Sequence, residues 1–200
     1  MRHSDTSGAA LPDAYNEPMA LEFTTSHLKD SLSLFHYYKA LAEKAMAQVK
    51  DEELLFASDE ESNSIAIIVK HMAGNMRSRW TDFLTADGEK PDRNRDSEFE
   101  DAPQNREELM RVWEDGWDHV FNALGPLNDL QLADTVKIRG EAHSVLQAIN
   151  RQVGHYAYHV GQIVLLAKQR RSGDWTSLSV PRRGSSDFNR RVGEGKASQR

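Results

Sequence analysis

Two histidines four residues apart are the side chains in this sequence best suited to chemistry. His155 and His159 lie in the run GHYAYHVGQIVLLAK (154–168), whose apolar spacing predicts a helix. Side chains at i and i+4 share one face of a helix, one turn apart, so both imidazoles can bind the same metal ion. The pair alone is a weak signal, because such spacing occurs by chance and most histidines are not ligands.

A third histidine strengthens the hypothesis of a metal site. His71 lies in the middle of a second predicted helix, 64–84, on a face that changes from apolar to polar. That face also carries Asn75, Ser78 and Asp82, which is the pattern expected of a helix that lines a cavity. Helical bundles build metal sites from side chains on facing helices, so His71 can complete a three-histidine site.

The donor set limits both the metal and the reaction. Three neutral imidazoles suit Zn²⁺, Ni²⁺, Fe²⁺ or Cu²⁺ and are poor ligands for Mg²⁺ or Ca²⁺. Three protein ligands also leave a coordination position open for water or substrate. The polar residues that share the two histidine faces are candidates for the pocket wall or for orienting the imidazoles: Asn75, Ser78, Asp82, Gln152 and Gln162. Tyr156 and Ala157 stand between the histidines, so the glutamate base of HExxH peptidases is absent and peptide hydrolysis is not expected.

Composition excludes several other classes of protein. The chain has 200 residues, a net charge of −6 and no cysteine. The length predicts one domain with tails, and the acidic balance argues against a nucleic-acid-binding protein. The lack of cysteine removes disulfides, a thiolate nucleophile and cysteine-ligated zinc. We find no signal-peptide core and no apolar run near the roughly 20 residues of a membrane span, so we expect a cytoplasmic protein.

Hydrophobic periodicity predicts an all-α fold. Four helices are expected, over 21–50, 64–84, 104–124 and 145–170. Residues 1–20 are expected to form a flexible leader, 21–171 the helical bundle, and 172–200 a tail that docks in part and is disordered beyond Asn189. An alternating segment at 135–139 predicts half of a small β-hairpin, and Ser144 with Gln147 forms a capping-box signature at the start of the last helix.

The segment 85–103 predicts a loop, because it is densely charged and contains Gly88 and Pro91. It is longer than most loops without structure of their own, which favours a covering role. Four arginines lie in or just before it: Arg77, Arg79, Arg93 and Arg95. They can bind an anionic ligand, but salt bridges to the many nearby carboxylates are the commoner explanation of such arginines.

The last helix has a second apolar side. Val153, Ala157, Val160 and Val164 form a seam opposite the histidines. A helix buried all round packs against a second chain or is covered by another segment, so the seam predicts a homodimer or a docked tail. Gly154 and Gly161 lie on one flank, where they would allow close helix approach.

The motifs taken together resemble the DinB/YfiT-like superfamily. The similarity lies in HxxxHxGQI (155–163), in KHMAGN around His71, in the run RSRWTDFLTADGEKPDRNRDSEF (77–99), and in the tail around 178–189. It extends over about 21–189, and the run at 77–99 resembles a bacterial branch described only as a domain of unknown function.

The resemblance implies a four-helix bundle, often dimeric, whose metal is bound by His71, His155 and His159. Characterised relatives include S-transferases that use bacillithiol or mycothiol, and a mycothiol-dependent isomerase. Two hypotheses of different class follow for this chain. It is a metal-dependent enzyme, such as an S-transferase with a low-molecular-weight thiol as cosubstrate, or it is a non-catalytic, stress-related binding protein or dimer with a vestigial metal site.

Overall fold

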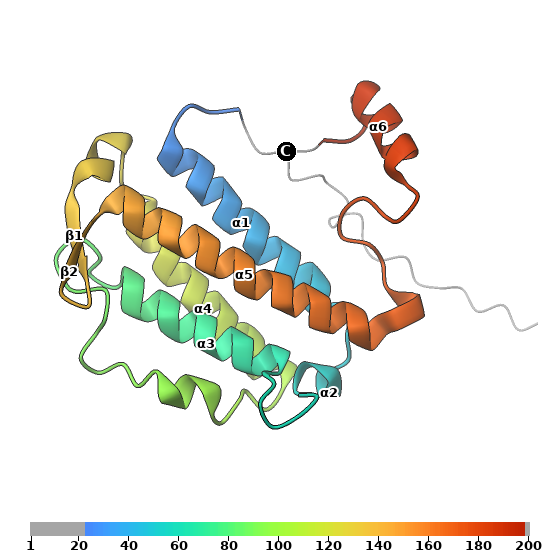
Figure 1. The fold of residues 1–200 in the computed structure, drawn as a ribbon, viewed down its shortest axis with the longest axis horizontal. Coiled ribbons are helices and arrows are strands. Elements are labelled where there is room, and N and C mark those ends of the chain that lie inside the picture. The colour runs from blue at the N-terminus through green and yellow to red at the C-terminus, as the bar shows by residue number, and fades with distance from the viewer. Residues whose placement is uncertain (1–22, 199–200) are drawn as a thin grey trace, which may run out of the picture.

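The computed structural model describes residues 23–198, which are mostly helical with one small sheet (Figure 1). Four long helices make up most of this part of the chain: α1 (His27–Met46), α3 (Ile65–Trp80), α4 (Arg106–Leu124) and α5 (Val145–Arg171). The shorter elements are α2 (Asp51–Leu54), α6 (Ser185–Gly193), the strands β1 (Thr135–Ile138) and β2 (Glu141–Ser144), and the 3₁₀ turns η2 (Asp96–Phe99), η3 (Asp129–Ala133) and η4 (Ser172–Asp174). No helix among these residues is both long enough and apolar enough to cross a membrane. The predicted leader at 1–20 lies outside the described residues.

Side-chain caps fix where the long helices begin. The Ser64 hydroxyl accepts a hydrogen bond from the Ile67 amide, and Ser144 forms the predicted capping box with Gln147. The first helix starts later than the sequence suggested, because Ser26 caps it at His27. The second predicted helix ends earlier, at Trp80, because Asp82 has a φ of 48° and cannot continue a right-handed helix.

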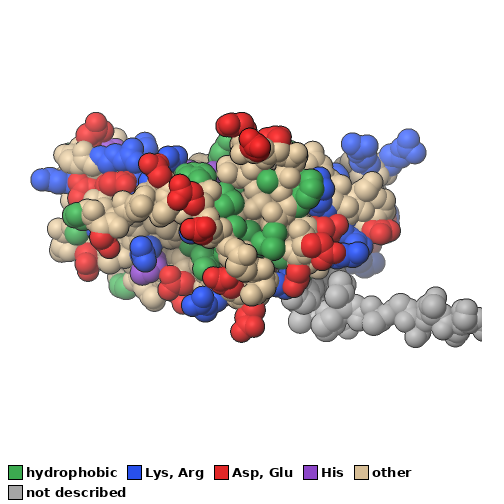
Figure 2. Space-filling model, turned by 90° about the horizontal axis from the view of Figure 1, so that it is seen from below, with side chains coloured by type: hydrophobic (Ala, Val, Ile, Leu, Met, Phe, Trp, Pro, Cys, Tyr) green, Lys and Arg blue, Asp and Glu red, His purple; other side chains and the backbone are tan. Residues whose placement is uncertain are grey.

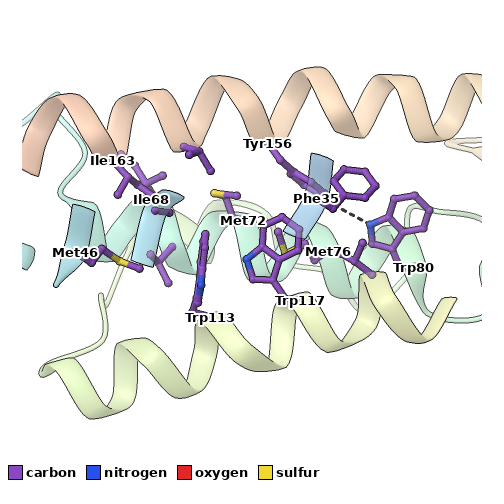
Figure 3. Packing of buried hydrophobic residues seen from close by; sticks show 14 of the residues in the cluster. Phe35, Met46, Ile68, Met72, Met76, Trp80, Trp113, Trp117, Tyr156 and Ile163 are labelled. Atoms are coloured by element: carbon purple, nitrogen blue, oxygen red, sulfur yellow. Dashed lines mark hydrogen bonds between the residues drawn. The ribbon is translucent and has the colours of Figure 1, made fainter. Parts of the chain in front are cut away.

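The long helices enclose a core rich in aromatic rings. Helix α3 packs against α4 and α5, and α1 packs against α5 and α4 (Figure 1). Trp117 from α4 packs with its ring centroid 6.1 Å from Phe35 of α1 and 5.6 Å from Tyr156 of α5 (Figure 3). A Cβ at Gly116 would lie 2.9 Å from the Ala73 Cα, so this glycine allows α3 and α4 to approach closely.

One polar group closes this core at the end near the β-hairpin. The Tyr156 hydroxyl accepts a hydrogen bond from Trp80 Nε1 at 2.9 Å (Figure 3). It donates one to Asn75 Oδ1 at 3.3 Å. The side chain is fully buried, and this burial raises the pKa of the Tyr156 hydroxyl far above its ordinary value. Tyr156 therefore connects α5 to α3 directly beside His155.

The predicted hairpin is present, with β1 and β2 antiparallel and Ile138 paired with Glu141. Arg139 and Gly140 form its two-residue turn with φ values of 56° and 79°, the combination of a type I′ turn. Both turn amides donate to the Asp87 carboxylate, each at 2.7 Å, and the Gly88 amide donates to the Lys137 carbonyl. The 85–103 loop is thereby fastened to the hairpin.

The apolar seam of α5 is occupied within the chain itself. Val160 is buried, and Val153 and Val164 pack against the hydrophobic core that α1 and the other long helices form. A Cβ at Gly154 or Gly161 would meet no described atom within 4 Å, so these glycines do not mediate a close helix contact in this chain.

Part of the tail packs against the long helices, and the tail also carries one further short helix. Trp175 and Leu178 pack against the core, and the chain continues as α6 to Gly193. Arg190 pairs with Asp187 one turn before it and with Glu194 one turn after it. Such i,i+3 and i,i+4 pairs stabilise short helices, even in a segment that contains glycines.

Candidate metal centre

The three predicted histidines converge between α3 and α5. One ring nitrogen from each of His71, His155 and His159 lies within 4.8 Å of the other two. The ring centroids are 4.6 Å apart for His155 and His159, and 4.9 Å apart for His71 and His159. His71 is buried and the α5 pair is half-buried. Three histidines are thus close enough to hold one metal ion.

His71 is oriented by a carboxylate that the sequence analysis did not identify. Its Nδ1 lies 2.8 Å from Oε2 of Glu98, and both side chains are almost completely buried. An ionised carboxylate can only accept hydrogen bonds, so His71 donates one from Nδ1 to Glu98. The lone pair of the neutral ring is then on Nε2, where it is available to the site that the three histidines share. This is the carboxylate–histidine arrangement that orients metal ligands in proteins.

The α5 histidines are arranged for the same purpose. Nδ1 of His159 lies 2.8 Å from Oε1 of Gln162, which accepts a hydrogen bond from it. The proton of the neutral ring is therefore on Nδ1, and Nε2 carries the lone pair. That Nε2 lies 3.1 Å from Nε2 of His155. Nδ1 of His155 is buried and has no hydrogen-bond partner among the described residues. Two imidazole nitrogens facing each other across this distance need a proton or a cation between them.

Electrostatics keep the α5 pair neutral, as metal binding requires. Burial, with the neighbouring His159 and His71, lowers the pKa of His155 from 6.5 to about 3. Burial also lowers the pKa of His159, although its hydrogen bond to Gln162 acts in the opposite direction. Both lone pairs are therefore available at neutral pH.

The predicted loop at 85–103 covers this centre. Its 3₁₀ turn η2 places Glu98 on His71, and Phe99 stacks on the same imidazole with ring centroids 4.7 Å apart. Arg93 holds Glu98 from the other side, with Nε 2.7 Å from Oε1 and a second nitrogen 3.0 Å from Oε2. Burial alone would raise the pKa of Glu98, but the hydrogen bonds from His71 and Arg93 lower it overall.

A glycine on α3 makes room for the Glu98 carboxylate. Gly74 lies one turn after His71, and a Cβ built on it would be 2.6 Å from Oε1 of Glu98. Any side chain at this position would have to displace the carboxylate from His71. The glycine of the KHMAGN segment thus has a steric role in the site.

A pocket of about 460 Å³ opens beside the histidines. His71 and His155 are in its wall, together with the predicted pocket residues Asn75 and Gln152. Its other basic side chains include Arg79, Arg93 and Arg95 from the predicted arginine group, together with Arg139 and Arg151, which the sequence analysis did not select.

The structure does not bring every candidate residue to this pocket. Ser78 acts indirectly, since its hydroxyl donates to the Gly88 carbonyl and accepts from the Lys90 amide, which holds the loop on α3. Asp82 is exposed and lies in a different hollow, beside His119. Arg77 is exposed and lines another hollow, whose wall contains none of the three histidines.

The structure shows the predicted salt bridges at two of the four predicted arginines, and the anion-binding alternative stays a prediction. Arg79 and Arg93 are buried and ion-paired with Glu89, which matches the salt-bridge explanation. Arg95 is half exposed at the pocket, and its nearest carboxylate, Asp96, is 4.0 Å away. A mid-helix glycine next to His71 was the sequence signal that could have indicated an incoming group such as Glu98.

The donor set fits a borderline divalent metal. Two of the three histidines have a hydrogen-bond acceptor at Nδ1, and one ring nitrogen of each histidine lies within 4.8 Å of the other two. A site made only of imidazoles, with no carboxylate ligand, disfavours Mg²⁺ and Ca²⁺.

Comparison with known proteins places the chain in a family. Residues 22–184 match the family described as "Protein of unknown function (DUF1572)". No curated protein and no solved structure matches the chain. The match covers most of the sequence, including the three histidines, Glu98 and the arginines of the pocket. The chain therefore belongs to the DUF1572 family of proteins of unknown function.

Proposed function

We propose that this protein is a metal-dependent enzyme of the DinB/YfiT-like four-helix-bundle type, acting on small molecules. A divalent transition metal, Zn²⁺ or Ni²⁺ before others, would be held by His71, His155 and His159. The observation that carries the proposal is the convergence of three imidazole nitrogens within 4.8 Å of one another. The packing of four long helices around this site is consistent with the bundle that the sequence resemblance implies.

The residues around the site have separable tasks. Glu98 and Gln162 fix the ring orientation of His71 and His159. Phe99 and the loop behind it cover His71 on one side, while the pocket leaves access on the other. When bound, the metal supplies Lewis acidity and an open coordination position, where the pKa of a thiol or water is lowered.

The reaction class that fits best is S-transfer from a low-molecular-weight thiol. The thiol sulfur would bond to an electrophilic carbon as the leaving group departs, with the thiol proton released to solvent. The chain has no cysteine, so the thiol must be a cosubstrate. Screening the metal-loaded protein with several small thiols and electrophiles tests this reaction class.

Metal binding is tested first, independently of any reaction. The protein is purified without a His-tag, loaded with Zn²⁺ or Ni²⁺, and its metal content is measured by elemental analysis. We expect one ion per chain in the wild type and loss of that ion in His155→Ala. His143→Ala is the matched control, because His143 lies on β2 and, among the described residues, its side chain bonds only the Glu141 carbonyl. Equal metal content in wild type and His155→Ala contradicts the proposal.

A non-catalytic, stress-related binding protein with a vestigial site is the second candidate. Such a protein is expected to fill the space beside His71 with apolar side chains such as Ile67, Ile68 or Leu166. In the structure none of these three lines the pocket, and Ile68 belongs to the hydrophobic core. This observation favours the enzyme.

A homodimer, which the resemblance implies, would use a different face of α5 from the predicted seam. Tyr158 and Leu165 are exposed on that helix, beside Gly154 and Gly161. Light scattering on the wild type and on Leu165→Glu tests this assignment: a dimer that becomes a monomer supports it, and a monomeric wild type contradicts it.

A further inference from the structure

The pocket beside the histidines is lined by five arginines: Arg79, Arg93, Arg95, Arg139 and Arg151. No carboxylate of the described chain lines it. Figure 2 shows Lys and Arg side chains gathered at the hairpin end of one face of the molecule, although the net charge of the whole chain is −6. A concentration of one charge in a concave site attracts ligands of the opposite charge.

The five arginines form two groups. The floor (Arg79 and Arg93) is ion-paired with glutamates, whereas the rim (Arg95, Arg139 and Arg151) has weak ion pairs or none among the described residues. On the floor, Arg79 and Arg93 are buried and bound to Glu89 and Glu98. At the rim, Arg139 is more than half exposed and only shares Glu89, at 3.3 Å. Arg151 is exposed and has neither an ion pair nor a hydrogen bond within residues 23–198.

The carboxylates of residues 23–198 therefore neutralise the charges of the rim only in part. The Glu89 carboxylate accepts hydrogen bonds from Arg79 at 2.8 Å and from Arg93 at 3.2 Å, so Arg139 shares it with two other arginines. Arg95 lies 4.0 Å from the exposed Asp96, a distance at which an ion pair in water contributes little. Arg139 shares its only carboxylate partner among the described residues with two other arginines, and Arg95 and Arg151 have no closer one, so these three guanidinium groups can still donate to an added anion.

Buried polar atoms in the pocket wall also lack partners. Nε of Arg79, Oε1 of Gln152 and Nδ1 of His155 have no hydrogen-bond partner within residues 23–198, although all three residues line the pocket. The side chains of Arg79 and Gln152 are 6% and 2% exposed, respectively. Buried polar groups without partners are rare in folded proteins, and three around one cavity indicate a polar ligand.

The rim is also held in place by the fold. Arg139 occupies the type I′ turn that the Asp87 carboxylate fixes through two backbone amides. Arg151 lies on α5, one turn before His155. A site on fixed elements binds with less loss of conformational entropy than a site on a mobile loop.

We propose that this pocket binds the carboxylate or phosphate group of a small organic substrate, through Arg139 and Arg151 with Arg95, and so places the rest of that molecule against His71 and His155. The inference deepens the function proposed above, because the anion would lie beside the metal centre. Guanidinium groups suit this task, since they donate two parallel hydrogen bonds to carboxylate or phosphate oxygens.

The test measures anion binding to metal-free protein, so that it does not depend on the metal. Inorganic phosphate and succinate are titrated separately by calorimetry at low ionic strength, which distinguishes a phosphate site from a carboxylate site. The variants are Arg139→Gln and Arg151→Gln, both at exposed positions. Arg182→Gln in the exposed tail is the control for loss of one positive charge.

We expect at least one anion to bind, and each pocket variant to weaken it by roughly tenfold, as loss of one charge-assisted hydrogen bond predicts. Arg182→Gln should bind as the wild type does. Absence of binding by both anions at millimolar concentration overturns the inference, as does equal weakening by all three variants. Metal analysis of Arg151→Gln separates the two proposals: metal retained with anion binding lost supports the pocket, whereas a wild type that binds anion but no metal contradicts only the metal centre.

Discussion

Oε2 of Glu98 lies 2.8 Å from Nδ1 of His71, and this contact joins the 85–103 loop to the three-histidine centre. The residues are 27 positions apart, and both are buried. A loop that carries the carboxylate partner of His71 does more than cover the site, because it also determines which nitrogen of His71 faces the other two histidines.

Replacing Glu98 by Gln should weaken metal binding without unfolding the protein. The amide can still accept one hydrogen bond, but it no longer stabilises a His71 imidazole polarised by the metal. We expect affinity for Zn²⁺ to fall by roughly 10- to 100-fold, measured by competition with a chelator. Glu100→Gln, an exposed position in the same loop, is the control. Equal affinities for the two variants would show that the carboxylate has no role in the site.

Gly74→Ala should have the same effect for a steric reason. The new Cβ would lie 2.6 Å from Oε1 of Glu98, so the carboxylate must move away from His71. We expect a loss of Zn²⁺ affinity similar to that of Glu98→Gln. In the control Gly161→Ala, where a Cβ meets nothing within 4 Å, metal affinity should not change. The free energy of unfolding of the control should rise by about 0.5–1 kcal/mol, the usual gain for Gly to Ala within a helix.

Acid should destabilise the metal-free protein through its α5 histidines. Folding lowers the pKa of His155 from 6.5 to about 3, and it lowers that of His159 as well. Below about pH 6.5 the unfolded chain therefore binds more protons than the folded chain. The free energy of unfolding falls as the pH drops from about 6.5 towards 3.

The upper limit of this dependence is about 1.4 kcal/mol per pH unit for each histidine, and solvent screening at these half-buried rings reduces it. Urea unfolding across the window, for the wild type and His155→Gln, measures the slope. We expect a shallower slope in the variant, because acidic residues contribute equally to both proteins. Identical slopes would mean that His155 is not held neutral by folding.

Tyr156→Phe should reduce stability but not metal binding. The change leaves Trp80 Nε1 without an acceptor and Asn75 Oδ1 without its donor in a buried environment. An unsatisfied buried group costs about 1–3 kcal/mol in free energy of unfolding, measurable by urea denaturation. Tyr158→Phe is the control, because that side chain is 64% exposed. A Tyr156→Phe protein as stable as the control would show that the buried hydroxyl is not needed.

Local sequence was enough to predict the helices and the three histidines of the candidate site. Apolar periodicity predicted the four long helices, the last two to within two residues at each end, and the capping box at Ser144 gave the start of α5 directly. The i,i+4 spacing of His155 and His159 is a property of the helix itself, so it could be predicted without knowledge of the fold. The polar face of the second helix was enough to select His71 as their partner.

Tertiary structure decided what surrounds those three histidines. Nothing in the local pattern distinguishes Glu98 from Glu100, because their difference arises only when η2 folds onto α3 beside Gly74. Arg139 and Arg151 come from a turn and a helix that are remote in sequence from the arginine group at 77–95, and only packing places them around one pocket. Periodicity records which face of a helix is buried, whereas the contacts of a loop depend on where the rest of the chain places it.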